Sequence, residues 1–317
     1  MAGLLTRFVA RRLAALFVTL LAASVVIYGA LHLGPGDPAA LLAGGRSPDP
    51  EVLAAVRAQY HLDDPFWTRY GRWLSDVAGW RLGRSMTFGT DVAGLISARL
   101  GNTLFLVGYA AVLILVIGIG FGLLGALGGR VGATITTVSS GVLMAVPAFI
   151  AAIVLIWLFA TRLNWLPVFG SGTGFTGRIE HLTLPALALA GSYIAYLSRI
   201  TRSAVATELR SERVETARSR GVRMPAIVRR HVLRNAAAPV LTVSGLTVAG
   251  LIAGTVVVEQ AFGVSGVGSL LVLAAQKQDF VVVQNISLLM VAAFCVANTL
   301  VDVLNAVLDK RLLRTGR

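Results

Sequence analysis

The chain has 317 residues, of which 56% are hydrophobic and only 14% are charged, and its formal net charge is +13 at pH 7. Soluble domains carry about 25% charged residues, so this composition, with apolar runs longer than about 18 residues, excludes a soluble globular protein and predicts a polytopic membrane protein. The positive charge does not indicate nucleic-acid binding, because the arginines gather at the ends of apolar runs, where they meet anionic headgroups.

Residues 1–33 are predicted to form a short cytoplasmic N-terminus and the first span. Arg7, Arg11 and Arg12 precede the uncharged run 13–33, which is long enough to cross about 30 Å as a helix. A cleaved signal peptide is the alternative, but the run is too long and no clean small-x-small cleavage site follows it. We therefore expect an uncleaved span whose N-terminus is cytoplasmic.

Residues 34–99 are predicted to form an external helical segment between the first and second spans. Their acidic residues and arginines balance in number, which is consistent with a segment under no positive-inside bias. Asp49, Asp64 and Asp91 each precede an expected short amphipathic helix, and a proline follows the first two at the first helical position. The helix after Asp64 is rich in aromatic residues, which predicts a position at the outer membrane interface.

Residues 100–317 are predicted to form a core domain of five spans, at 100–129, 131–161, 182–198, 236–258 and 280–308. Pro147 is expected to kink the second of these spans. Basic residues are concentrated in the segments that this topology places on one side, so the positive-inside rule predicts six spans with both termini cytoplasmic. The expected fold is an all-α integral membrane protein.

A loop at 199–239 separates two of these spans and holds ten of the 28 basic residues, so it cannot lie in hydrocarbon. Residues 204–220 repeat apolar side chains at helical spacing, Gly221 follows as a C-terminal cap, and Pro225 restarts a helix. The repeated apolar residues are Val205, Leu209, Val214 and Ala217. An amphipathic helix lying on lipid is the alternative, but the apolar face is thin, which favours docking into a groove of a protein partner.

Two short patterns suggest chemistry, each with a structural alternative, and a third that ATP hydrolysis would require is absent. Gly120–Gly125 matches GxGxxG, but it lies inside an apolar span without the strand that a dinucleotide site needs, so close helix packing is favoured. Gly263–Gly266 resembles the GxSG of intramembrane proteases, but no histidine is established as a base for Ser265, so a glycine-rich turn is favoured. Neither Lys277 nor Lys310 follows a glycine, so there is no Walker A loop for ATP hydrolysis.

Few residues outside these patterns suggest a site. Cys295 is the only cysteine, which excludes an internal disulfide and a cysteine cluster for a metal. Glu259 and Asp302 are the ionisable residues expected within the spans, and groups at such depth are functional candidates. Their positions near span ends favour structural pairing or gating over a proton relay. No metal site is expected.

The residues of the loop carry a resemblance to a known family. Glu215-Thr216-Ala217, followed by Gly221, matches the EAAxxxG loop of permease subunits in ATP-binding-cassette importers, with Thr216 in place of the first alanine. The longer run that begins at Val214 resembles the dipeptide, oligopeptide and nickel permeases in particular. Further pieces of the resemblance extend over nearly the whole chain: Arg11-Arg12, Pro35–Pro38, Leu62–Pro65, Leu82–Ser85, Glu259, Phe262, Gly266 and Gly268.

The resemblance implies the type I importer permease fold and a bacterial plasma-membrane location. It implies that the chain forms half of a peptide pathway with a second, similar permease subunit. Two cytoplasmic ATPase subunits would use ATP and Mg, and an extracytoplasmic binding protein would deliver the peptide. This chain would bind no cofactor and carry no catalytic residue. A permease for nickel chelates or other small solutes is the alternative, and a stand-alone secondary transporter is a further one.

The resemblance also implies roles for individual residues. The residues implied to couple the chain to the ATPases are Leu209, Val214, Glu215, Thr216, Ala217, Arg218, Gly221 and Pro225. The residues implied as candidates for a gate or for the pathway are Glu259, Phe262, Gly266, Gly268 and Asp302.

Overall fold

The computed structural model describes residues 2–32, 50–59, 63–85 and 87–308. Apart from one isolated β-bridge, the regular elements of these residues are helices. The expected turn at 35–38, the expected cap Asp49 and the basic C-terminal residues lie outside the described residues.

Four stretches of the described residues are long and apolar enough to cross a membrane. They lie in α1 (Ala2–His32), in α5 (Val92–Leu113) with α6 (Ile119–Leu127), in α12 (Leu233–Ala261) with the turns before it, and in α14 (Phe280–Leu308). A π-helical turn, η1 (Ile114–Gly118), joins α5 to α6 without a break. The predicted helix after Asp91 and the predicted span 100–129 are therefore one helix, not two.

A fifth apolar stretch is broken in the middle. It consists of α7 (Gly129–Ala145) and α8 (Ala148–Leu155) with the π-helical turn η2 (Ile156–Arg162), and its two parts are bent by 104°. The break falls at Val146 and Pro147, whose backbones are extended. Proline was expected to kink this span, and the structure confirms a bend at that residue that is much sharper than a kink.

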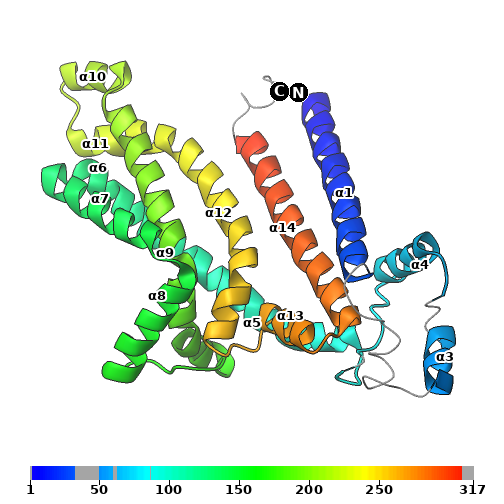
Figure 1. Cartoon of the computed structure of the whole chain (residues 1–317). Helices are drawn as coiled ribbons and strands as arrows, with labels where there is room; N and C mark the ends of the chain where they lie inside the picture. The colour runs from blue at the N-terminus through cyan, green and yellow to red at the C-terminus, as the bar shows by residue number, and fades with distance from the viewer. Residues whose placement is uncertain (1, 33–49, 60–62, 86, 309–317) are drawn as a thin grey trace.

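The helix α9 (Gly174–Leu209) has 36 residues and packs against α5, α6, α7, α8 and α12. It contains the predicted span 182–198 and continues past both of its ends. The buried core around it is aliphatic and includes Leu106, Ile114, Leu189, Leu197 and Leu251. α9 is therefore the helix around which α5 to α8 and α12 pack, while α1 and α14 lie on the far side of α12 (Figure 1).

Of the two predicted N-terminal helix caps that fall on described residues, one was correct and one was wrong. Asp91 caps α5 as expected, since its carboxylate accepts a hydrogen bond from the Gly94 N–H at 3.1 Å. Asp64 does not cap α4 (Phe66–Ala78), because Pro65 occupies the N-cap position and Asp64 pairs instead with Arg72 at 2.5 Å. One residue of displacement thus moves a carboxylate from a cap to a surface ion pair.

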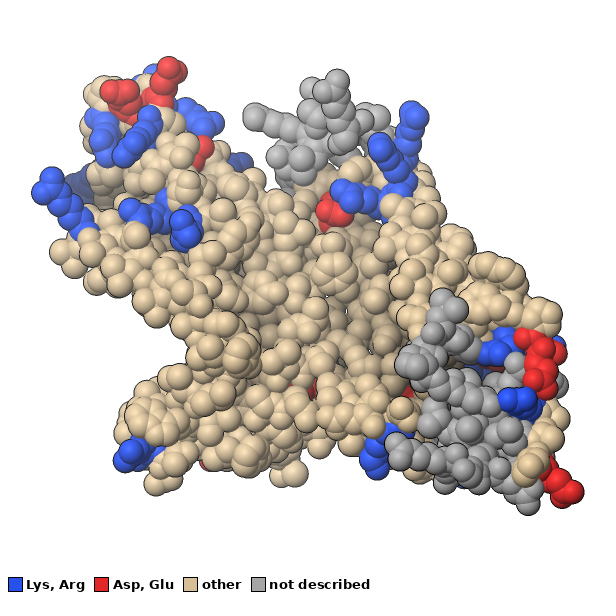
Figure 2. All heavy atoms as spheres, viewed as in Figure 1, with Lys and Arg blue, Asp and Glu red and all other residues tan. Residues whose placement is uncertain are grey.

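The helix ends sort into two groups. The start of α1, the end of α14 and the short helix α10 (Glu212–Ser219) lie at one end, and α3 (Pro50–Gln59), α4 and α13 (Val267–Gln276) lie at the other (Figure 1). Figure 2 shows Lys and Arg gathered around α10 and the start of α1, while the surface between the two ends is largely free of charged side chains. This distribution suits a helical bundle that crosses a membrane.

The aromatic helix α4 packs on the bundle through one face. Tyr70 and Trp73 are buried against Tyr28 of α1 and Leu288 of α14, and the Tyr70 hydroxyl lies 2.8 Å from the Ser24 hydroxyl. Trp67, whose ring contacts those of Phe66 and Tyr70, is 67% exposed. The predicted aromatic helix therefore exists, and three of its four aromatic residues, Phe66, Tyr70 and Trp73, hold it against α1 and α14.

A buried carboxylate fastens the segment before α5 to the start of α14. Asp279 accepts hydrogen bonds from the Val282 N–H at 3.2 Å, from the Ser85 hydroxyl at 2.5 Å and from the Thr87 N–H at 3.1 Å. Nearby, the Asn285 amide donates to the Leu82 carbonyl at 2.9 Å. The run Leu82–Ser85 was noted in the sequence without a role, and these contacts give it a structural one.

Replacing Asp279 by Ala should destabilise the protein. The change leaves the buried Ser85 hydroxyl and two backbone N–H groups without this acceptor, which should lower the free energy of unfolding by about 2–3 kcal/mol. The measurement is the Tm of the purified protein in detergent. Asp76→Ala is the matched control, because Asp76 forms an exposed pair with Arg81 at 2.9 Å and should shift Tm little. Equal shifts for both variants would contradict the assigned role.

Candidate functional site

The arginine-rich loop forms a compact helical unit at one end of the molecule (Figure 1). α9 ends at Leu209, α10 begins after Ser211, and α11 (Met224–Ile227) leads through the π-helical turn η3 (Val228–Val232) into α12. The single helix predicted over 204–220 was therefore wrong. Ser211 is extended, and its carbonyl accepts hydrogen bonds from the next turn, so it starts a new helix.

Gly221 ends α10 as predicted. Its φ is +75°, in the left-handed region that favours glycine. The Val222 N–H donates to the Ala217 carbonyl at 3.1 Å and the Gly221 N–H to the Arg218 carbonyl at 2.9 Å. These two bonds are the pattern of a Schellman cap. The cap turns the chain sharply from α10 into α11.

One face of α10 is buried against the chain's own helices. Val214 and Ala217 are 1% and 8% exposed and pack with Val205, Ile227 and Val232. The small side chain of Ala217 thus permits close approach within this chain. α10 is consequently held on the ends of α9 and α12 by a small apolar core.

The opposite face of α10 is open. The exposed residues among those proposed for coupling are Glu215, Thr216, Arg218, Gly221 and Pro225, while Leu209 is half-buried at the end of α9. Arg213 pairs with Glu208 at 3.0 Å, which ties the turn before α10. Exposed Val222 and Met224 add apolar surface beside the charged side chains. This mixture of charged and apolar groups suits a protein contact better than lipid insertion.

The far end of α12 carries a buried carboxylate. Glu259 is 0% exposed; its side chain accepts hydrogen bonds from the Thr103 hydroxyl at 2.6 Å and the Ser269 N–H at 2.9 Å. Thr103 in turn accepts a hydrogen bond from the Val267 N–H at 2.9 Å. A carboxylate in this place satisfies free N–H groups at the N-terminus of α13. Glu259 therefore joins α12, α5 and α13.

The turn before α13 is shaped around Glu259. A Cβ added at Gly266 would overlap the Glu259 carboxylate, and one added at Gly268 would lie 2.7 Å from the Val256 Cα. Phe262 is 1% exposed, and its carbonyl accepts a hydrogen bond from the Gly170 N–H at 3.2 Å. Four of the five gate or pathway candidates thus come together here. Sequence reasoning missed Thr103 and Ser269, because a lone Thr or Ser gives no signal of a partner far away in the chain.

The fifth candidate, Asp302, lies elsewhere. It is on the last third of α14 and pairs with Arg12 of α1 at 2.8 Å. This pair agrees with the structural pairing favoured for Asp302 on sequence grounds. The contact fixes the end of α14 against the start of α1.

The two patterns that resembled enzyme motifs have structural roles. At Gly122, an added Cβ would collide with Thr201 of α9, which confirms close helix packing in the GxGxxG run. Near the GxSG pattern, the Asn102 amide donates to the Ser265 carbonyl at 3.0 Å, and the His181 ring bonds the Phe169 carbonyl at 2.9 Å. Among the described residues there is also no group of three or more side chains that could hold a metal ion.

Comparison with known proteins decides the family. Residues 114–314 match the family of binding-protein-dependent transport system inner membrane components, and residues 5–107 match its N-terminal region. The chain belongs to this family. It is thus a permease subunit of an ATP-binding-cassette transporter, a multi-pass protein of the plasma membrane and not an enzyme.

Individual relatives match along their whole length. The oligopeptide transport system permease protein AppB of Bacillus subtilis is 35% identical over 318 residues, covering 96% of this chain and 98% of the relative. The glutathione transport system permease protein GsiC of Escherichia coli K12 is 34% identical over 307 residues, covering 95% and 97%. A solved structure of the inward-facing MetNI methionine ABC transporter shares the fold, with a TM-score of 0.53 at 16% identity over 70% of this chain and 96% of that chain.

Replacing Glu259 by Ala should destabilise the protein strongly. The change leaves the Thr103 hydroxyl and the Ser269 N–H without their acceptor, and each donor left unsatisfied should lower the free energy of unfolding by about 1–3 kcal/mol. Glu259→Gln should cost less, because the amide oxygen can still accept from the Ser269 N–H. Thermal unfolding in detergent is the measurement, with the exposed Glu180→Ala as control. A Tm for Glu259→Ala equal to that of the control would refute the structural role.

Proposed function

We propose that this permease is half of the membrane passage of an ATP-driven peptide importer. The observation that carries the proposal is full-length similarity to relatives named for oligopeptide and glutathione transport. The second half would be a similar, non-identical permease. A binding protein outside the membrane would deliver the peptide, and two cytoplasmic ATPases would hydrolyse ATP with Mg.

In the proposed topology the chain crosses the membrane six times, with α9 as the remaining span. The start of α1, the end of α14 and α10 lie at the same end of the bundle, which supports placing both termini and the arginine-rich loop in the cytoplasm. Residues 34–99 would then lie outside. The exposed Trp67 and Trp80 on and beside α4 support a position at the outer membrane interface.

The open face of α10 is proposed to dock into a groove on an ATPase subunit. Its buried face and its Schellman cap support this role, because they hold the helix rigidly on the ends of α9 and α12. From Met224 the chain continues as one helical stretch to Ala261. Displacement of α10 by the ATPase would therefore reach Glu259, and through it α5 and α13, without crossing a flexible joint.

Replacing Gly221 by Val should uncouple the permease from ATP hydrolysis. Both Gly221 and Gly120 have no atom within 4 Å of an added Cβ, but only Gly221 has a positive φ. Val at Gly221 should therefore add about 1–2 kcal/mol of backbone strain at the docking helix. If this strain opposes docking, the stimulated rate of ATP hydrolysis should fall roughly tenfold. The measurement is ATP hydrolysis by the reconstituted complex when its binding protein is loaded with peptide.

Gly120→Val is the control for this experiment, and Gly221→Asn should retain activity because Asn tolerates the left-handed conformation. If peptide stimulates ATP hydrolysis fully in an intact Gly221→Val complex, the coupling proposal is wrong. If nickel chelates, and not peptides, stimulate ATP hydrolysis by the wild-type complex, the proposed substrate class is wrong and nickel chelates take its place.

Thiol labelling should reveal the proposed topology. With Cys295 replaced by Ser, a single cysteine is placed by Trp67→Cys on α4 or by Glu212→Cys on α10, both at exposed positions. A membrane-impermeant maleimide should label position 67 in intact spheroplasts, and position 212 only after the membrane is opened. Labelling of position 212 in intact spheroplasts would contradict the cytoplasmic location of the loop.

A further inference from the structure

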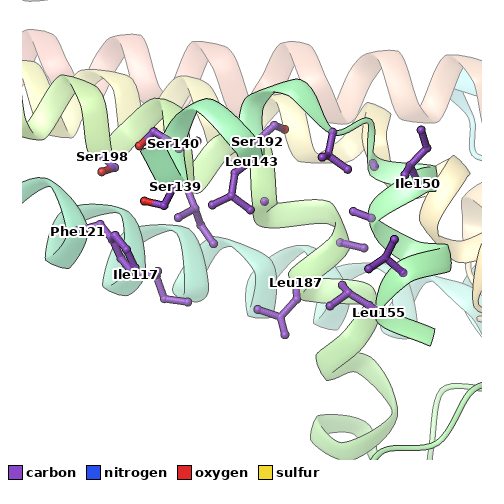
Figure 3. Close-up of a pocket in the computed structure, with 18 of the residues that line it drawn as sticks. Ile117, Phe121, Ser139, Ser140, Leu143, Ile150, Leu155, Leu187, Ser192 and Ser198 are labelled. Atoms are coloured by element: carbon purple, nitrogen blue, oxygen red, sulfur yellow. The ribbon is translucent and has the colours of Figure 1, made fainter. Parts of the chain in front are cut away.

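The bend between α7 and α8 forms, with α9, a partly open cavity of about 530 Å³. Figure 3 shows that the side chains around it come from α6 with its preceding turn, from both arms of the bend and from α9. Ser139, Ser140 and Ser198 gather at one end of the cavity, and Leu155 and Leu187 lie toward the other (Figure 3). None of its lining residues is charged.

Small residues of α9 form part of the cavity wall. Ala188, Ser192 and Ala195 recur at spacings of four and three residues and line the cavity together with Gly191. A Cβ added at Gly191 would meet only the Leu143 Cδ2, at 3.9 Å, so the space beside it is open. Small residues at this spacing let a second helix approach closely inside a membrane.

A buried hydroxyl at the serine end has no partner. Ser198 is 1% exposed, and within the described part of the chain its Oγ atom makes no hydrogen bond. A helical serine commonly bonds the carbonyl one turn before it, whereas this one lines the cavity instead. Leaving such a group unsatisfied costs about 1–3 kcal/mol. The unpaired hydroxyl therefore indicates that a polar group from outside this chain enters the cavity and forms a hydrogen bond with Ser198.

The backbone at the bend excludes lipid as the natural cover. Val146 and Pro147 interrupt the helix near the middle of the broken span, and Val146 and Ala148 line the cavity. Irregular backbone at membrane depth occurs where protein buries it or where it lines a water-filled space, not against lipid chains. The largely apolar wall is unsuited to a stable water filling, so the remaining cover is protein.

We propose that this cavity receives a transmembrane helix of the second permease subunit. An apolar side chain of that helix fills the bend beside Gly191, and a polar group on it bonds the Ser198 hydroxyl. Exposed Phe149, Ile150 and Ile153 on α8 extend the contact around the cavity. The inference rests on the proposed function, since it assigns the surface through which the two halves of the passage meet.

Filling the cavity should prevent assembly. Gly191→Leu places a side chain in the space that the partner helix occupies, and it should reduce co-purification of the second permease at least tenfold. Gly108→Leu is the matched control, because Gly108 is an exposed helical glycine on α5 with no atom within 4 Å of an added Cβ. The Tm of each purified chain shows whether it folds. Normal assembly of a folded Gly191→Leu chain overturns the proposal.

Photo-crosslinking in the intact complex tests the same surface without a destabilising change. A p-benzoylphenylalanine in place of Ile150 should attach to the second permease, and one in place of Leu304, exposed on α14, should not. In a complex that contains both permeases, the other outcomes are attachment of the Ile150 probe to phospholipid or to a second copy of this chain. Either result shows that the proposed contact surface is wrong but leaves the proposed function standing. If the wild-type chain assembles with no second permease, the proposed function itself fails.

Discussion

The architecture depends on one buried carboxylate. Glu259 lies where α12 ends, and its hydrogen bonds reach Thr103 on α5 and the first turn of α13. A polar group buried in an apolar interior is costly unless it is hydrogen-bonded, so these partners must be in place in the folded protein. The glycines at 266 and 268 leave room for these contacts. The sharp return from α12 into α13 is therefore built around a hydrogen-bonded carboxyl group and not around a turn sequence alone.

In the arginine-rich loop, the two faces of the short helix α10 have different roles: one attaches it to the chain and the other is available to a partner. Val214 and Ala217 anchor α10 inside the chain, while Glu215, Thr216 and Arg218 point outward. A docking element needs both properties, because a partner can move only what is firmly attached. The inward residues are thus as necessary to the proposed coupling as the outward ones, although they would touch no other subunit.

Local signals in the sequence predicted local structure well. The long apolar runs, the cap at Asp91 and the left-handed Gly221 were all anticipated, because each depends on a few neighbouring residues. The bond from Ser85 to Asp279 and the clamp on Glu259 join residues far apart in sequence, and no local pattern encodes such pairings. The break at Ser211 was missed because the apolar spacing continues through it, whereas the size of the bend at Pro147 depends on packing against α9.

The length of α9 has a geometric consequence. Its 36 residues extend about 54 Å at 1.5 Å per residue, whereas the hydrocarbon core of a bilayer is about 30 Å thick. In the proposed topology α9 must therefore project well beyond the hydrocarbon, and its last turns act as a stalk. In that topology the stalk would place α10 in water, beyond the headgroups. A soluble partner could then contact the exposed face of α10 from the aqueous side without displacing lipid.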